Sequence, residues 1–497
     1  MSRSGLVQLV EQLRREVGEV RSENERLRGE NAALRKEVTR LKESGQQGGS
    51  EGKNPTQRLD ESYSVAAEER RRDRDQDRAG SGNKGSGKKG SGRRGRRPTE
   101  EKIESADVRE IVLPEGFSVE QCTWIRDRPV WRIIGGQSVR VVYGIWHGPN
   151  GERPVIDGVL PRSEFGLEIH VAIAYQVFVM HLSLDKACQE LAFFWNLPLG
   201  KSQADALLNQ LASHWEQDFE ALCHLLAVSA VVHADETGWS VRSVWAFLSE
   251  KVRVIIHGCH KDGATLAQLL DKDTFQGALV SDDAAVYQGF TLAQKCWAHL
   301  LRKAIRLSLQ YPDNQEYCAF LDELLSVYQR AKQIAAKRMS KADRDVCVEA
   351  LTDSLAAACV SRSDEKFDEV ATEEEREFTN LVREVNRLLW AGELFTFVTH
   401  PGVDGTNNEA ERSLRPTALD RRTGRTNKTV RGARRRTVLV SMLESIKLHL
   451  PEFHLAAVLE EVSSWLSAGE SRFTRMLRQT GLDRPENSRL NSLIPDL

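Results

Sequence analysis

The chain has 497 residues, of which 40% are hydrophobic and 29% charged, and its formal net charge is −2 at pH 7. This length allows several domains with a sizeable core, and the near-neutral charge excludes a protein that is basic throughout. Eight cysteines are scattered without CxxC pairs, which excludes a disulfide framework, and the longest apolar run, residues 171–180, is too short to cross a bilayer. We expect a cytoplasmic protein with reduced thiols and no membrane partner.

A seven-residue repeat occupies the first part of the chain. Leu or Val recurs at Leu6, Leu13, Val20, Leu27, Leu34 and Leu41, and the intervening core positions are Val10, Val17, Asn24, Asn31 and Val38. The repeat predicts a coiled coil within residues 1–45, and asparagine at core positions favours a parallel dimer. We therefore expect a homodimer or higher homo-oligomer through residues 6–41. A single amphipathic surface helix is the alternative.

Residues 46–105 form a predicted disordered linker, since Gly, Ser, Lys and Arg dominate this segment. Residues 83–98 hold seven Lys or Arg and no acid. Such a block indicates either DNA contact or a solvated tether, and the composition leaves both open.

Two segments precede the predicted catalytic region. Residues 106–161 contain β-like runs at 130–134 and 139–143 with glycine turns, which predict a small β-rich domain. Residues 162–227 show apolar side chains at three- and four-residue spacing, which predicts a helical domain for packing or DNA contact.

An α/β pattern runs through residues 228–450. We predict strands at 228–235, 244–248, 252–256, 278–282 and 295–298, a short helix at 264–270, and a helix from residue 300. The order β-β-β-α-β-α-β-α is that of a ribonuclease-H-like fold. A charged helical insertion is expected at about 308–394, and residues 451–497 are expected to form a C-terminal helical tail.

Three acids stand at positions where they can meet. Asp235 and Asp282 end predicted strands, and Glu411 lies near the start of a predicted helix for which Asn408 is the predicted N-cap. Carboxylate oxygens suit Mg²⁺ or Mn²⁺, and two ions about 3.5–4 Å apart can promote an in-line phosphoryl displacement. Asp283 competes with Asp282 for the second position. Each acid also has an ordinary explanation as a turn, capping or ion-pair residue.

A basic run surrounds Glu411. Residues 412–436 contain ten Lys or Arg and one acid, Asp420. This pattern indicates a site where a metal ion and the phosphate backbone of a nucleic acid bind at one point. We expect DNA phosphates to be held by Arg302, Lys303, Arg412, Arg415, Arg421, Arg422, Arg425, Arg434, Arg435 and Arg436. A solvated basic helix and loop is the alternative.

Four ordered blocks resemble the IS66 family of insertion-sequence transposases. They are HADETGW at 233–239, SDDAAVY at 281–287, CWAHLLRK at 296–303 and NNEAERSLRP at 407–416, and the resemblance covers about residues 160–450. These are DDE-type enzymes with a ribonuclease-H-like core. The resemblance implies that Asp235, Asp282 and Glu411 are catalytic, and it places the third acid at Glu411 and not at Glu409. It favours Asp282 over Asp283 because the family's second aspartate lies five residues before a tyrosine, here Tyr287.

Two further features bear on metals. Cys296 and His299 resemble a C-x-x-H element of other transposase superfamilies, and the pair supplies at most half a zinc site. We expect His299 either to act near the scissile phosphate or to be structural. The family usually carries a four-cysteine zinc segment before the core, but only Cys122 stands there, so residues 106–161 are interpreted as a degenerate zinc-binding segment.

The leading prediction is a bacterial DNA transposase, associated with the nucleoid when it binds DNA. It would hydrolyse a phosphodiester at the element end with Mg²⁺ or Mn²⁺, and the exposed 3′-hydroxyl would then attack target DNA. The resemblance also implies accessory transposition proteins as partners. The alternatives are a structure-specific nuclease of the same fold and a catalytically inactive DNA-binding relative.

Overall fold

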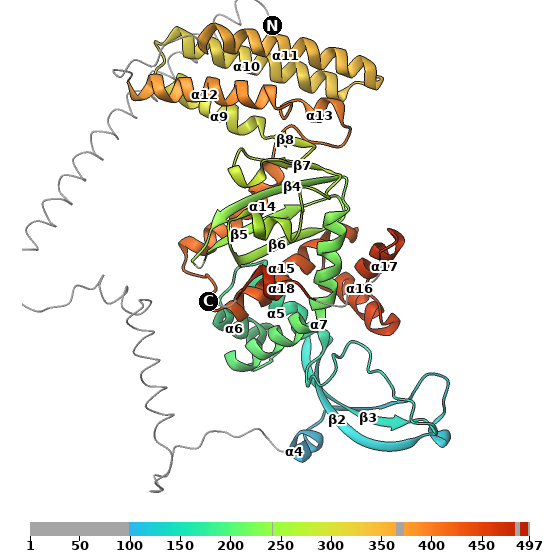
Figure 1. The fold of residues 1–497 in the computed structure, drawn as a ribbon. Helices are drawn as coiled ribbons and strands as arrows, with labels where there is room; N and C mark the ends of the chain where they lie inside the picture. Colours follow the sequence, from blue (N-terminus) through green and yellow to red (C-terminus); the bar gives the residue numbers. More distant parts are fainter. Residues whose placement is uncertain (1–98, 241, 364–371, 483–487, 496–497) are drawn as a thin grey trace, which may run out of the picture. The chain divides into compact units, whose positions relative to one another are not determined.

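The computed structural model describes residues 99–240, 242–363, 372–482 and 488–495 (Figure 1). The predicted coiled coil and the linker up to residue 98 lie outside these residues. At the end of the linker the expected disorder up to residue 105 is replaced by helix α4 (Thr99–Glu104). No helix among the described residues is long and apolar enough to cross a membrane.

Residues 106–161 contain a three-stranded sheet with a core of its own. Its strands are β1 (Val108–Val112), β2 (Thr123–Ile134) and β3 (Gln137–His147), in the order β1-β3-β2. Gly135 and Gly136, with φ of 58° and 79°, close the β2–β3 hairpin, because a tight two-residue turn needs positive φ at both positions. The small core consists of Val130, Val141, Tyr143, Ile145, Ile156 and Val159.

Helices α5 (Leu167–Phe178), α6 (Leu184–Trp195) and α7 (Lys201–Ala227) follow this sheet. The long helix α7 buries Trp215, Phe219 and Leu222 completely. These side chains belong to the same hydrophobic core as the strands that come after residue 230. The boundary predicted at residue 227 therefore does not separate two cores, because α5–α7 pack into the same core as the strands that follow them.

A five-stranded mixed sheet lies at the centre of that region. The strands are β4 (Val231–Gly238), β5 (Ser243–Leu248), β6 (Arg253–Cys259), β7 (Ala278–Ser281) and β8 (Ala293–Lys295), in the order β6-β5-β4-β7-β8. Strand β5 is antiparallel to β4 and β6, whereas β7 and β8 run parallel to β4. Every residue of β5 is buried, as expected for a strand covered on both faces.

Two connections differ from the predicted element order. Helix α8 (Gly263–Ala267) joins β6 to β7 as expected. Between β7 and β8, however, the predicted helix is only a 3-10 turn, η2 (Ala285–Tyr287). The fifth strand ends at Lys295, and α9 begins at Trp297, three residues before the predicted helix start.

Helix α15 (Val430–His449) covers the edge strand β6 through a row of hydroxyls. The backbone N–H groups of Arg253, Ile255 and His257 each donate to a hydroxyl of α15 at 2.9 Å. The acceptors are Ser445, Ser441 and Thr437. The acceptors are four residues apart on the helix, a rise of about 6 Å, and the donors are two residues apart on the strand, a rise of about 6.6 Å. The spacing of hydroxyls on α15 therefore matches the spacing of N–H groups on β6. An edge that could pair with another chain is thereby covered.

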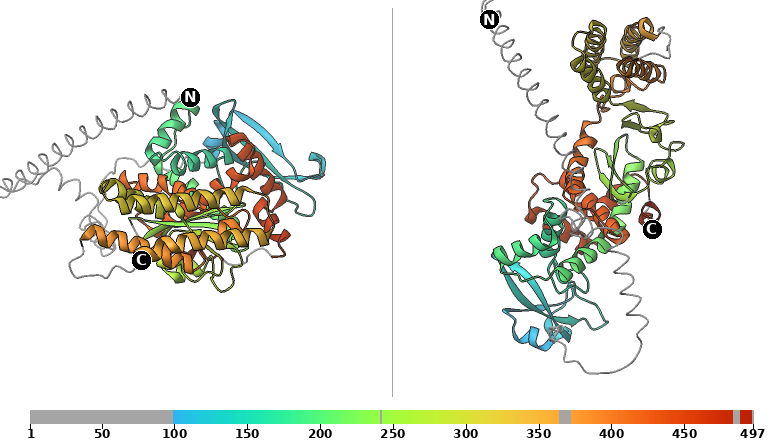
Figure 2. Two further views of the ribbon diagram at one scale, coloured as in Figure 1. Left: turned by 90° about the horizontal axis from the view of Figure 1, so that it is seen from above. Right: turned by 90° about the vertical axis from the view of Figure 1, so that its left-hand side faces the viewer.

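The remaining helices form a second core and the C-terminal region. Helices α9 (Trp297–Gln310), α10 (Gln315–Ala336), α11 (Lys341–Ser363), α12 (Glu373–Trp390) and α13 (Thr396–Thr399) pack against Ala278 and Val280 of β7. The axes of α10, α11 and α12 run side by side (Figures 1 and 2). Helix α14 (Asn408–Arg422) then returns to the sheet. Helices α16 (Leu455–Ala468), α17 (Arg472–Gln479) and α18 (Leu490–Leu493) complete the large core, so residues 451–497 are not a separate tail.

Candidate active site

The parallel pairing of β4 and β7 brings two aspartates to one edge of the sheet. The pairing ends with His233 opposite Val280. Asp235 and Asp282 each lie two residues further along, so they are neighbours on the same face of the sheet. Asp282 is oriented by its own turn, since its Oδ1 accepts the N–H of Ala284 at 3.0 Å.

Asn407 joins the start of α14 to this edge. Its side chain is fully buried, and its Nδ2 donates to the carbonyl of Ala234 at 2.7 Å. Its backbone N–H donates to Sγ of Cys296 at 3.1 Å. Glu411 lies in the first turn of α14 and donates its N–H to the carbonyl of Asn407 at 3.1 Å. The predicted N-cap, Asn408, is wrong by one residue: Asn407 holds that position, and its side chain bonds the strand instead of capping the helix.

The electrostatics of Asp235 link all three predicted acids. Burial, the largest cause, and the negative charges of Asp282, Glu236 and Glu411 together raise the pKa of Asp235 to about 7. A carboxyl group responds in this way when anions lie within a few ångströms in a poorly solvated site. Asp282 and Glu411 are therefore close enough to Asp235 to raise its pKa, and a cation placed among the three acids would relieve their repulsion.

The carboxylate of Glu411 has two basic neighbours on α9. Nη2 of Arg302 donates to its Oε1 at 2.5 Å, and Nδ1 of His299 lies 3.5 Å from the same oxygen. His299 thus stands beside the third acid, as expected for a residue near the reacting groups. A metal ion and Arg302 would compete for this carboxylate.

Glu411 belongs to two overlapping sets of possible metal ligands. Of the described side chains, Cys296, His299 and Glu411 bring three donor atoms within 4.8 Å of one another. Sulfur, nitrogen and oxygen donors of this kind suit zinc, so the structure adds a third donor to the Cys–His pair. The set of Asp235, Asp282 and Glu411 does not meet that distance, and its all-oxygen donors suit Mg²⁺ or Mn²⁺. A wider set fits two ions better than one, because each ion then needs only some of the carboxylates.

The competing acids have partners elsewhere. Asp283 forms an ion pair with Arg387 of α12, and Glu409 forms one with Arg253 of β6. The largest influences on the raised pKa of Asp235 include Asp282 and Glu411 but neither of these two acids. The geometry therefore favours Asp282 over Asp283 and Glu411 over Glu409.

Sequence reasoning missed a second layer around the acids. Glu236 points to the opposite face of β4 from Asp235, where it accepts a hydrogen bond from the hydroxyl of Tyr287 and pairs with Nζ of Lys261 at 2.5 Å. Nζ of the buried Lys295 donates to Oγ of Ser281 at 3.1 Å, and burial lowers the pKa of this lysine. Tyr287 belongs to a block already singled out, but the sequence carries no signal for the buried Lys295.

Part of the predicted phosphate-binding set is structural. Arg436 is 5% exposed, forms an ion pair with Asp420, and packs over the ring of Trp239. Asp420, the one acid of the basic run, is 2% exposed and also bonds Nδ1 of His181 at 2.9 Å, so it does not meet a metal. Arg436 is corrected from a phosphate contact to a buried partner of Asp420, because a backbone phosphate cannot reach it.

The two neighbours of Arg436 are also engaged within the protein. Arg435 forms an ion pair with Asp205 of α7, and Nη2 of Arg434 donates to the carbonyl of Ile494 at 2.7 Å. Lys303 pairs with Glu384 at 2.5 Å. Arg421 donates to the carbonyl of Gly238 at 2.8 Å, and Arg425 donates to the carbonyl of His181.

Three arginines of α14 fit the prediction best. Arg412, Arg415 and Arg422 are exposed, and none forms an ion pair within the part of the chain that the structure describes. Arg415 and Arg422 follow Glu411 by four and eleven residues, which places them on the same face of the helix. Positive charge therefore extends along α14 directly from the third acid.

The comparison with protein families found a match. A family model described as the transposase IS66 family matches residues 162–435, more than half of the chain. Asp235, Asp282 and Glu411 all lie inside the matched segment. No match was found among the curated proteins.

Proposed function

The chain belongs to the IS66 family of transposases, and we propose that it cleaves and joins DNA strands at the ends of an insertion sequence. The proposal is supported by the pairing of β4 with β7 and by the hydrogen bond from Asn407 to Ala234, which bring the segments that carry Asp235, Asp282 and Glu411 to one edge of the sheet, and the raised pKa of Asp235 agrees with it. Three carboxylates from two adjacent strands and one helix are the donors that phosphodiester chemistry with Mg²⁺ or Mn²⁺ requires.

The sheet supports a ribonuclease-H-like core. Its order β6-β5-β4-β7-β8 has three antiparallel strands followed by two parallel ones. Asp235 lies within β4 and Asp282 directly after β7, each two residues beyond the last pair of the β4–β7 ladder. The first two acids are thereby fixed by strands, and the hydrogen bond from Asn407 to Ala234 fixes the third.

The residues present fit a pair of divalent ions held by Asp235, Asp282 and Glu411. When bound, such ions supply Lewis acidity toward the phosphate and lower the cost of forming the attacking oxygen. The protein's own part is positioning and charge neutralisation, which phosphoryl transfer mainly needs. Arg302 and His299 stand beside Glu411, where they can hold a phosphate oxygen, and Arg412, Arg415 and Arg422 extend the contact along the DNA backbone.

The reaction has two in-line steps at the same carboxylates. In the first, water attacks the phosphodiester at the element end, and the 3′-oxygen leaves as a free hydroxyl. In the second, that hydroxyl attacks a target phosphodiester, one bond forms and one breaks, and no cofactor is oxidised or reduced. Pairing of two chains through residues 6–41 would bring two element ends together, and accessory proteins could assist.

Incubation of the purified chain with terminal-repeat DNA, target DNA and Mg²⁺ tests the proposal. We expect cleaved ends and joined products, both lost in Asp235→Asn and in Asp282→Asn but retained in Asp283→Asn. Cleavage without joined product would favour a structure-specific nuclease. Products that persist in Asp235→Asn, or a wild-type protein that binds DNA without any cleavage, would refute catalysis at this site.

A further inference from the structure

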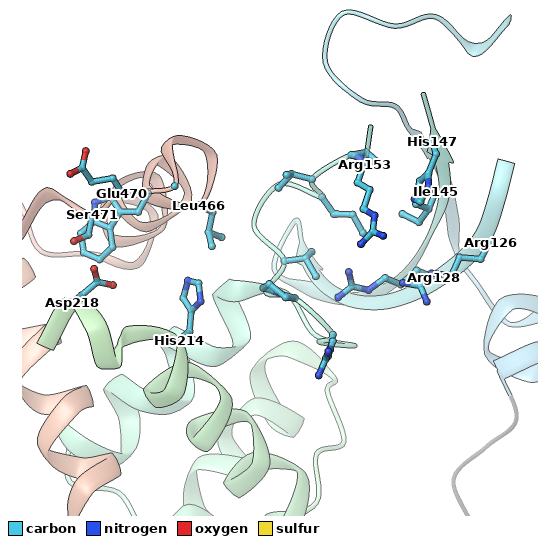
Figure 3. Close-up of a pocket in the computed structure, with 18 residues that line it drawn as sticks. Arg126, Arg128, Ile145, His147, Arg153, His214, Asp218, Leu466, Glu470 and Ser471 are labelled. Carbon is cyan, nitrogen blue, oxygen red and sulfur yellow. The ribbon is translucent and has the colours of Figure 1, made fainter. Parts of the chain in front are cut away.

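A cavity of about 520 Å³ lies outside the carboxylate site, between the β2–β3 hairpin and helices α7 and α16 (Figure 3). One wall carries four arginines, Arg126, Arg128, Arg153 and Arg162, together with His147. Arg128 and Arg153 point into the cavity from the hairpin and from the loop that follows it (Figure 3). None of the predicted phosphate-binding residues lies here.

The strand pattern explains how the arginines share a wall. Arg126 pairs with Ile145, and Arg128 is two residues from Arg126, so all three side chains are on one face of the hairpin. The side chain of Arg128 is held in position by two hydrogen bonds, because its Nη2 donates to the carbonyls of Leu160 and Ser163 at 2.9 and 2.6 Å. Arg162 follows in the left-handed backbone region, with φ of 63°, a conformation that costs an ordinary side chain about 1–2 kcal/mol.

The acids near this wall are bound to other groups. Glu152 accepts from the backbone N–H of Asn150 within its own turn, Glu164 pairs with Lys102, and Glu168 pairs with Arg132. Arg126, Arg153 and Arg162 are exposed and form no ion pair among the described residues. Positive charges that are not ion-paired on their own wall repel one another, and an anion with several oxygens would relieve that repulsion.

The opposite wall limits how an anion can enter. It carries Asp218 of α7, Glu470 and Leu466 (Figure 3), and Trp465 also lines the cavity. The carboxylate of Glu470 pairs with Nη2 of Arg478 at 2.7 Å and accepts a hydrogen bond from its Nη1 at 3.2 Å. A phosphate therefore has favourable contacts with the hairpin wall alone. An extended chain of phosphates passing along the hairpin satisfies this geometry better than a small anion enclosed from all sides.

We propose that the arginine wall of Arg126, Arg128, Arg153 and Arg162 binds the phosphate backbone of double-stranded DNA as a contact separate from the carboxylate site. The proposal rests on the proposed function for the identity of the polyanion. It also gives residues 106–161 a way to hold DNA that does not depend on a zinc ion.

The test measures binding of a labelled terminal-repeat duplex to the full chain at several salt concentrations. Arg126→Ala/Arg153→Ala removes two exposed contacts and spares Arg128, which fastens the loop. We expect about tenfold weaker binding at 0.15 M salt and a salt slope smaller by about 1.8, since each lost phosphate contact removes about 0.9. The control Arg109→Ala/Arg338→Ala removes the same charge from exposed positions that do not line the cavity and should leave the slope unchanged.

A second measurement does not depend on variant stability. A photocrosslinking amino acid placed at Val155, which lines the cavity and is 66% exposed, should crosslink to the duplex. The same group at Val346 of α11, also 66% exposed, should not. Unchanged affinity and slope in the double variant, or equal crosslinking at both positions, would overturn the arginine wall while wild-type cleavage still supports the carboxylate site. Weakened binding in the double variant, together with a wild-type chain that cuts no DNA, would support the wall and refute the catalytic proposal.

Discussion

The side-chain amide of Asn407 donates to the backbone carbonyl of Ala234 across 2.7 Å, and these residues lie 173 positions apart in the chain. Ala234 immediately precedes Asp235, and Asn407 immediately precedes the helix that carries Glu411. One buried hydrogen bond thus sets the position of the third acid relative to the first. The same residue bonds Cys296, so the start of α9 is tied to the same point.

Asn407→Ala should therefore weaken both the fold and the metal site. It leaves the carbonyl of Ala234 without its donor in a buried place, which costs about 1–3 kcal/mol of unfolding free energy. Urea unfolding and Mg²⁺ titration measure the two effects. The neighbouring Asn408→Ala, at an exposed position, is the matched control and should change neither. Equal behaviour of the two variants would contradict the role given to Asn407.

Asp235 should make stability depend on pH in a recognisable way. Its folded pKa of about 7 lies above the ordinary 3.8, so its stabilising contribution is complete below pH 3.8 and is lost as the pH rises through 7. Without divalent ions, Asp235→Asn should raise the Tm at pH 8 and have little effect at pH 4. Adding Mg²⁺ at pH 8 should raise the Tm of the wild type and not that of the variant.

The exposed Asp313→Asn serves as the control for this series and should follow the wild type at every pH. A wild-type Tm that does not respond to Mg²⁺, or an Asp235→Asn variant that is less stable at pH 8, would count against the clustered carboxylates.

The basic run should divide into structural and DNA-binding arginines. Arg436→Ala leaves Asp420 charged, buried and without its main partner, which costs about 3–5 kcal/mol. Arg415→Ala removes an exposed side chain and should change stability by less than about 0.5 kcal/mol, while lowering the salt slope of DNA binding by about 0.9. Chemical unfolding and fluorescence anisotropy distinguish them. A stable Arg436→Ala with a reduced salt slope would restore Arg436 as a phosphate contact.

The hydroxyl row of α15 should be needed for stability alone. Ser441→Ala removes the acceptor of the Ile255 N–H at the buried edge of β6, with an expected loss of about 1–3 kcal/mol. Ser464→Ala, whose hydroxyl bonds only within its own exposed helix turn, should cost much less. Unfolding midpoints of the two variants test the difference, and equal midpoints would mean that the edge strand does not depend on this hydroxyl.

Local patterns in the sequence determined the α/β class, the approximate strands and the three acids. Period-two and period-3.6 patterns depend only on residues close in the sequence. Short motifs such as those at 233–239 and 407–416 contain the candidate acids within a few residues of one another or of the residues that position them. The same information placed the end of β7 beside Asp282 to within one residue. It predicted a helix between β7 and β8 where there is a 3-10 turn, because residues 282–292 are too few to establish a helical periodicity.

Only the tertiary structure decided which charges meet. Arg436 and Arg415 look alike in a basic run, yet one is buried against Asp420 and the other is exposed, and this depends on which face of each helix packs. The bond between Asn407 and Ala234, the contact of the α15 hydroxyl row with β6, and the arginine wall each join residues from distant segments, and no local pattern encodes such pairings. The sequence alone identifies the charged and polar side chains, whereas tertiary packing decides which groups they contact.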